Sequence, residues 1–268
     1  MKAIILRIVL ILLVIGIPLT AAFEVQMINP NNIASGNIIS ILPAGLNFAT
    51  LTAEYGLNFR ASYTKLFGIN ELGYRSANLS WNRNRNYALG LRMYSFGDKF
   101  YNESQISIGY AHKFQEKITV AAGVNTFNLS IKDYYRTWSL ALDLGGIFYL
   151  WDNLAISLLF QNVNGAQLWK NGEPLPRVFC SGVKWNPISK ILLAAEIYKD
   201  TMYPFITRFG SQITLIKNID VLAGMQFNPD RYSYGLSFEW KALEVSAAYR
   251  SHLDLPHTIY FGCKLAIK

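Results

Sequence analysis

The sequence has few charged residues, and it has only one long uninterrupted apolar run. Charged residues make up 16% of the 268 residues, against about 25% in an ordinary soluble domain. Hydrophobic residues reach 51% and aromatic residues 14%, which is too much apolar surface for a disordered chain. The long apolar run lies at the extreme N-terminus, and a membrane-spanning helix needs about 20 such residues. The composition therefore excludes a bundle of membrane helices and indicates an all-β protein.

The N-terminal run has the features of a secretory signal. Lys2 and Arg7 are followed by the apolar run 8–17 and by the small residues Thr20-Ala21-Ala22. This order of charged, apolar and small residues is typical of a signal peptide. We therefore expect residues 1–22 to be removed by cleavage after Ala22. An uncleaved N-terminal anchor is the alternative.

Cysteine is scarce. An exported protein could pair Cys180 and Cys263, but the alternation described below places them on opposite faces of a sheet, so we expect no disulfide. The sequence has no cluster of cysteines and histidines with the spacing of a metal site. We expect neither a metal nor a cofactor.

After residue 49 the sequence alternates between apolar and polar residues. In the segment 232–240, for example, every second residue from Tyr232 to Trp240 is apolar, and the residues between them are Ser, Gly and Glu. Successive side chains of a strand point to opposite faces, so this pattern predicts a strand with one apolar face. About fourteen segments share it: 50–64, 69–82, 86–97, 102–114, 117–131, 136–150, 153–163, 177–186, 190–199, 204–216, 219–228, 231–240, 243–251 and 257–268.

The two faces of these strands indicate a membrane barrel. The polar faces carry mostly small residues and few charges, and we expect the apolar faces to end in a group of aromatic residues: Tyr94, Phe96, Tyr149, Trp151, Trp185, Tyr198, Trp240 and Tyr249. An apolar outer band, aromatic girdles and a polar interior define a transmembrane β-barrel. We predict a closed antiparallel barrel of about 14 strands over residues 49–268, monomeric, in contact with the lipid of a Gram-negative outer membrane. A water-soluble β-sandwich or lipocalin-like barrel is the alternative, although fourteen strands are too many for the lipocalin type.

The same parity assigns the charged residues of the strands to the interior, because a Lys or Arg facing the middle of the bilayer costs about 2–4 kcal/mol. The residues expected to line the lumen are Glu54, Arg60, Arg92, Asp143, Lys184, Glu196, Arg208, Glu239, Glu244, Arg250 and Lys264. They could fill a narrow barrel as a paired network, or they could line a path for a ligand.

Residues 23–48 do not fit the wall. Residues 27–48 lack alternation, and Asn31, Asn32 or Ser35 could cap a short helix that runs to Leu42. We expect residues 23–48 to form a plug inside the barrel, because the segment is too apolar for a free tail. The plug residues are Ile38, Ile39, Leu42, Pro43, Ala44 and Gly45. The alternative is a periplasmic tail that packs against the rim of the barrel.

The sequence gives little support to an enzyme. The three histidines are His112, His252 and His257, and no nucleophile is placed by the sequence within hydrogen-bond reach of any of them. No phosphate-binding loop or dinucleotide fingerprint is present. The net charge of +8 could suggest nucleic acid, but the expected outer-membrane location argues against that partner.

The chain resembles the FadL-type outer-membrane barrels, and more closely their PorV/PorQ-like branch. The resemblance rests on Leu42-Pro43-Ala44-Gly45-Leu46 before the first strand, where the family usually has Asn in place of Leu42. Further matches are 63–68, 86–91, 106–111 and 161–165. The resemblance implies a fourteen-stranded barrel with an N-terminal hatch in the lumen.

The resemblance also implies two functions. The first is passage of a hydrophobic or small amphipathic molecule across the outer membrane. The second is a scaffold or shuttle without transport activity in type IX secretion, with secretion-system proteins as partners. A transporter should show an apolar pocket beside residues 27–48 and a gap or kink in the wall, whereas a scaffold should show a filled lumen and exposed apolar loops.

Overall fold

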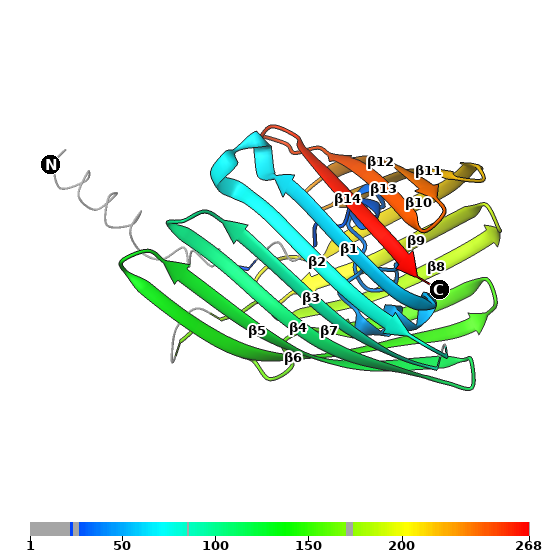
Figure 1. Cartoon of the computed structure of the whole chain (residues 1–268), viewed down its shortest axis with the longest axis horizontal. Coiled ribbons are helices and arrows are strands. Elements are labelled where there is room, and N and C mark those ends of the chain that lie inside the picture. Colours follow the sequence, from blue (N-terminus) through cyan, green and yellow to red (C-terminus); the bar gives the residue numbers. More distant parts are fainter. Residues whose placement is uncertain (1–21, 24–26, 85, 170–173, 268) are drawn as a thin grey trace, which may run out of the picture.

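The computed structural model describes residues 22–23, 27–84, 86–169 and 174–267. It is a closed barrel of fourteen antiparallel strands in sequence order, in which the first strand pairs with the last (Figure 1). The strands are β1(Gly56–Lys65), β2(Gly73–Asn82), β3(Tyr87–Gly97), β4(Tyr101–Phe114), β5(Ile118–Ile131), β6(Tyr135–Trp151), β7(Leu154–Phe160), β8(Val178–Ile188), β9(Ile191–Asp200), β10(Ile206–Ile216), β11(Ile219–Phe227), β12(Arg231–Trp240), β13(Leu243–Arg250) and β14(Thr258–Ile267). The predicted fold class is confirmed.

The alternation in the sequence becomes an inner and an outer face. In β1, Leu57, Phe59 and Tyr63 are exposed on the outside, and Asn58 and Arg60 are buried inside. The rest of the wall repeats this pattern, so the exposed surface of the barrel carries a broad band of Leu, Ile, Val and aromatic side chains. Closure gives every strand a neighbour on both sides, so the sheet has no edge strand with a whole row of unpaired backbone groups.

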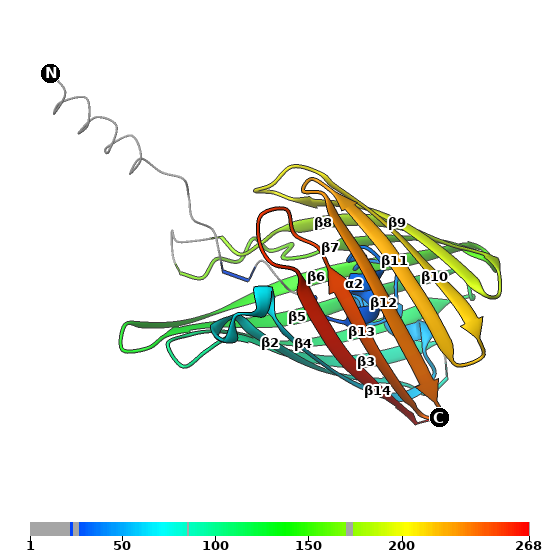
Figure 2. The same ribbon diagram turned by 90° about the horizontal axis from the view of Figure 1, so that it is seen from above.

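The two ends of the barrel differ. At the end we call the turn end, β14 finishes and the connections are short: 83–86, 115–117, 152–153, 189–190, 217–218 and 241–242. At the opposite loop end the connections include 66–72, 161–177 and 251–257. The long strands β4, β5 and β6 extend furthest toward the loop end, so that rim is slanted (Figures 1 and 2).

Four of the aromatic residues assigned to the outer face lie inside, so this part of the prediction was wrong. Tyr94, Phe96 and Tyr198 pack in buried clusters, and Tyr149 packs against another. The reason is parity: Tyr94 lies two residues from the inward Arg92, and Tyr198 lies two residues from the inward Glu196. The other four are exposed or half-exposed as expected: Trp151, Trp185, Trp240 and Tyr249.

The chain before β1 differs from the prediction in its local structure. The helix α2(Pro30–Ala34) begins at Asn29, whose side chain accepts hydrogen bonds from the N–H groups of Asn31 and Asn32. Pro30 suits the first turn because it lacks an N–H that would need a partner. The predicted caps, and a helix that continues to Leu42, were therefore wrong.

The first strand starts later than predicted. The 3₁₀ helix η1(Phe48–Ala53) occupies the residues that were expected to open it. Within the described part of the chain, no helix has both the length and the apolar character needed to cross a membrane. The predicted signal segment 1–22 lies outside the described residues except for Ala22.

Candidate functional site

The segment 27–53, which we call the plug segment, lies inside the barrel. Its helix α2 packs against β11 to β14, and η1 packs against β2 to β6 on the other side (Figure 2). Among the predicted plug residues, Ile38 and Leu42 are buried in one apolar cluster and Ile39 in another. Gly45 is buried, and Pro43 and Ala44 are half-buried. The segment therefore spans the lumen and touches both halves of the wall.

Glycines in the wall let the plug segment approach the strands closely. A Cβ added to Gly224 would lie 2.0 Å from the backbone N of Gly36, and one added to Gly210 would lie 2.4 Å from the carbonyl oxygen of Ser35. At this place the turn of the plug segment after α2 rests directly on the backbone of β10 and β11. A larger residue at either position would displace the turn.

Phe48 fills a second recess of the wall. Its ring occupies the space above Gly109 and Gly123, where added Cβ atoms would lie 2.0 and 2.4 Å from ring carbons. The guanidinium of Arg92 lies over the other part of the ring, 3.8 Å from its centroid. Phe48 is 2% exposed. Sequence reasoning missed this residue, although glycines within the alternation of β4 and β5 were the available signal.

A buried ion pair holds the middle of the plug segment. The Nη1 of Arg208 donates to Oε1 of Glu196 at 2.8 Å and to the carbonyl oxygen of Asn37 at 2.8 Å. The Oε2 of Glu196 accepts from the N–H groups of Ile39, at 3.0 Å, and Ser40, at 2.7 Å. The side chains of Glu196 and Arg208 are 0% and 5% exposed. One ion pair of the wall thus binds three residues of the plug segment.

A second charged cluster lies toward the turn end. Glu54 pairs with Arg60 and, through its other oxygen, with Nζ of Lys264 at 2.8 Å. Lys264 also lies 3.7 Å from Glu244. Glu244 accepts a hydrogen bond of 2.6 Å from the side chain of Asn31 in α2. This cluster therefore joins α2 of the plug segment, and Glu54 directly after that segment, to β1, β13 and β14.

The remaining predicted lumen residues have separate surroundings. Arg92 donates to the carbonyl oxygen of Leu46 at 2.6 Å, and Asp143 accepts from the N–H of Asn162 at 2.9 Å. Arg250 donates to Oε1 of Gln226 at 2.7 Å. Lys184 is half-buried on the inner face of β8, and Glu239 is exposed at the turn end of β12.

Small hollows remain between the plug segment and the wall. One of about 270 Å³ lies beside the second charged cluster, and two of about 30 and 20 Å³ lie beside Arg92. Ala44, whose φ is 58°, lines all three. Their linings mix polar and apolar groups. An apolar hollow of about 500 Å³, lined by Trp185, Phe209 and Tyr234 among others, involves the outward face of β8 to β12 instead.

Two features are expected of a transporter: an apolar pocket beside the plug segment and a gap or kink in the wall. The three hollows found beside the plug segment are not purely apolar. Most strands pair with both neighbours, and β3 has an unbroken one-to-one register with β2 and β4. The exception is β6, which pairs with β7 only over residues 144–151, so its residues 135–143 have no strand partner on that side. Gly145 makes room for the side chain of Asn47. Apart from the loop-end part of β6, the strands of the described wall are continuously paired. The two cysteines are free, with Cys180 buried and Cys263 exposed.

Comparisons with known proteins identify relatives by structure alone. No protein-family model matches the chain, and no curated protein sequence matches it. Solved structures do. The CymD monoaromatic hydrocarbon channel has a TM-score of 0.69 at 14% identity, covering 92% of this chain and 99% of that one.

Two further structures agree with this match. A FadL homologue of Pseudomonas aeruginosa has a TM-score of 0.65 at 9% identity, with 91% and 99% covered. The toluene transporter TodX of Pseudomonas putida has a TM-score of 0.62 at 12% identity, with 87% and 96% covered. The chain thus shares the fold of FadL-type barrels, and at that level the resemblance is confirmed. The finer assignment to the PorV/PorQ-like branch stays a prediction.

Proposed function

We propose that this protein is an outer-membrane channel for hydrophobic or small amphipathic molecules, in which the plug segment is the gate. The observation that carries the proposal is the position of residues 27–53, which span the lumen and are held there by reversible polar contacts. The likeness to CymD and TodX supports the substrate class, since those proteins are described as a monoaromatic hydrocarbon channel and a toluene transporter.

The orientation follows from the two ends of the barrel. Bacterial outer-membrane barrels have short periplasmic turns and longer extracellular loops. We therefore place the turn end in the periplasm and the loop end outside the cell. The exposed apolar band would contact lipid, and the single closed wall suits a monomer. Residues 1–22 would serve as the export signal.

Ala44 marks the place where the gate would open. It lines all three internal hollows, so a shift of the turn 42–46 would join them into one path. The turn is held by Arg92 through the carbonyl oxygen of Leu46. Breaking this hydrogen bond replaces it with one to water or ligand, so its net cost is modest. In this mechanism the wall stays closed and only the plug segment moves.

Uptake into liposomes tests the proposal. Purified protein is reconstituted, and entry of toluene is followed for the full chain and for a variant that lacks residues 27–42. The deletion should raise the rate well above that of the full chain, which should itself exceed protein-free liposomes. The matched control is Phe59→Ala, a truncation of an exposed outer-wall residue, which should behave like the full chain. Rates equal to those of protein-free liposomes in all three proteins would refute the channel.

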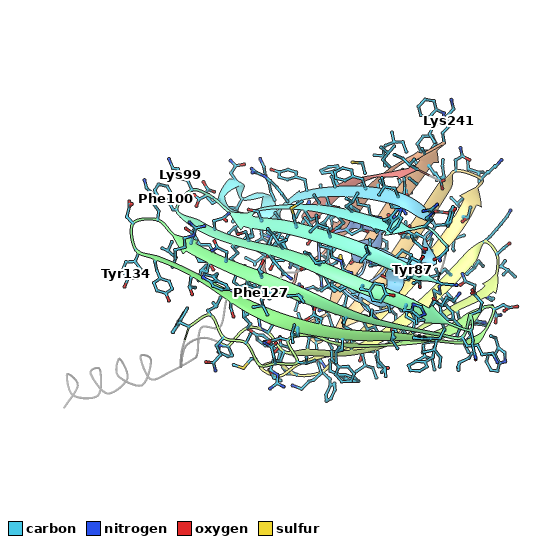
Figure 3. All side chains as sticks on the ribbon, turned by 60° about the horizontal axis from the view of Figure 1, so that its bottom comes forward. Tyr87, Lys99, Phe100, Phe127, Tyr134 and Lys241 are labelled. Carbon is cyan, nitrogen blue, oxygen red and sulfur yellow. The ribbon has the colours of Figure 1, made fainter. Side chains whose placement is uncertain are left out.

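One observation favours the second function, a scaffold without transport activity. Apolar side chains are exposed at the tips of several connections of the loop end, including Phe100 at 55%, Tyr134 at 87% and Leu253 at 70%. Figure 3 shows Lys99, Phe100 and Tyr134 at the tips of the long hairpins. Such tips could bind a secretion-system protein. This function predicts no uptake with or without the plug segment.

A further inference from the structure

Phe23 occupies a built apolar site at the loop end. Its side chain is 0% exposed, and its ring meets that of Phe127 edge to face with 5.0 Å between centroids. Leu129, Leu168 and Leu175 complete the same buried cluster. The site is formed by β5 and by the β7–β8 connection, and Figure 3 marks the place of Phe127 on the wall. Phe23, near the start of the described chain, is thus as fully buried as a residue of the protein core.

A buried carboxylate lies at the backbone nitrogen of the same residue. The N–H of Phe23 donates to Oε2 of Glu103 at 2.8 Å. Tyr101 donates its hydroxyl to the other oxygen, Oε1, at 2.7 Å. Glu103 is 2% exposed, and a carboxylate so far from water is stabilised by positive charge and by hydrogen bonds.

The sequence places an export cleavage site at this nitrogen. The small residues Thr20-Ala21-Ala22 predict cleavage of the bond between Ala22 and Phe23. Hydrolysis adds the OH of one water to the carbonyl carbon of Ala22 and a hydrogen to the nitrogen of Phe23. The products are a carboxylate on the released leader and an amine, which is protonated at neutral pH because its ordinary pKa is about 8.

We propose that Glu103 is the binding site for the new α-ammonium of Phe23. Export processing, catalysed by a signal peptidase, converts a neutral amide donor into a cation at an atom that already touches the carboxylate. The Phe23 ring fixes the position of that atom, and the ion pair fixes the mature N-terminus at the loop end. The plug segment is then anchored on both sides: by Phe23 at the loop end and by the continuation of η1 into β1 at the turn end.

The first test is the chemistry of the mature N-terminus. Protein purified from outer membranes is analysed by intact mass and by its N-terminal peptide, which should begin at Phe23. The α-amine is then labelled with an amine-reactive ester near pH 7. It should react about tenfold more slowly than in Glu103→Gln, because each unit of pKa changes the neutral, reactive fraction about tenfold. Glu71→Gln, which alters an exposed carboxylate of the β1–β2 connection, should label like the unaltered protein.

A second variant keeps the test decisive if Glu103→Gln does not fold. One glycine inserted between Ala22 and Phe23 leaves Glu103 and the ring site intact but moves the α-ammonium by about 3.8 Å. Its α-amine should label as fast as that of Glu103→Gln. A mature chain that starts at another residue would overturn the proposal. Equal labelling rates in the unaltered protein and the insertion variant would overturn it as well.

Discussion

Glu196 and Arg208 face each other across β9 and β10, and together they bind the backbone of residues 37–40 in the plug segment. The pair belongs to the wall, yet its remaining hydrogen bonds go to the plug. Loss of either charge leaves the other buried without compensation, which is the costly case for an interior ion pair. The same two residues therefore connect the stability of the barrel to the position of the plug segment.

Glu196→Gln should destabilise the protein by about 3–5 kcal/mol, because it leaves Arg208 as an uncompensated buried charge. Heat-dependent migration on gels, which separates folded from unfolded barrels, gives the change in stability. In the double variant with Arg208→Gln the loss should be smaller than the sum of the single losses, since the two residues interact directly. Additive losses would show that the pair is not coupled.

Gly224→Ala should push the turn at Gly36 away from β11, because the new Cβ would lie 2.0 Å from a backbone nitrogen. Overpacking of this kind costs about 1–3 kcal/mol. The matched control is Gly146→Ala, whose Cβ would meet nothing closer than 3.6 Å and should leave stability almost unchanged. Equal melting temperatures for the two variants would contradict the close contact.

Phe48→Ala should both weaken the protein and open its lumen. Removal of a buried Phe costs about 3–5 kcal/mol, and the vacated space is the recess over Gly109 and Gly123. Toluene entry into liposomes should rise above that of the unaltered protein. Phe59→Ala removes the same side chain from the outer face and should change neither property. An unchanged rate in Phe48→Ala would mean that this recess is not part of the path.

His252, in the β13–β14 connection, should respond to acid. Partial burial, together with Arg231 and Arg250, lowers its pKa from 6.5 to about 4, and its ring packs edge to face on Phe67. An unfolded chain takes up the proton first as the pH falls. The stability that neutral His252 contributes is therefore complete above about pH 6.5 and is lost as the pH falls toward 4.

Nuclear magnetic resonance of the imidazole checks this directly. The signal of His252, assigned by its absence in His252→Asn, should titrate well below the ordinary range. Titration near pH 6.5 would show that the connection does not dock on Phe67 in solution.

Period-two alternation was enough to predict fourteen strands, and most observed bounds lie within two or three residues of the prediction. The errors arose where a residue was assigned to the outer face because it is aromatic, and not by its position in the alternation. Tyr94 and Tyr198 were placed outside as girdle aromatics, although Arg92 and Glu196, two residues away, had been placed inside. Aromatic rings also fill the space between wall and plug segment, so their type alone does not identify the lipid face.

The candidate site was predictable only in part. Inward charges follow from the cost of placing them in lipid, and a hairpin turn near 201–205 already brings Glu196 opposite Arg208. The partners of Glu54 in β1 and β14, and those of Ile39 in β9, depend on barrel closure and on the path of the plug segment through the lumen. Those contacts join residues far apart in the sequence, and local patterns do not encode them.

The plug segment packs against both halves of the wall, and this has a consequence for the order of folding. Helix α2 packs on β11 to β14, so the first part of the chain finds half of its contacts among the last strands to be synthesised. Closure of β1 on β14 likewise joins segments about 200 residues apart, and contacts of such long range form slowly. The plug segment cannot complete its contacts before the last strands of the wall have formed. We therefore expect a chain that still lacks β12 to β14 to leave residues 27–36 exposed to proteases.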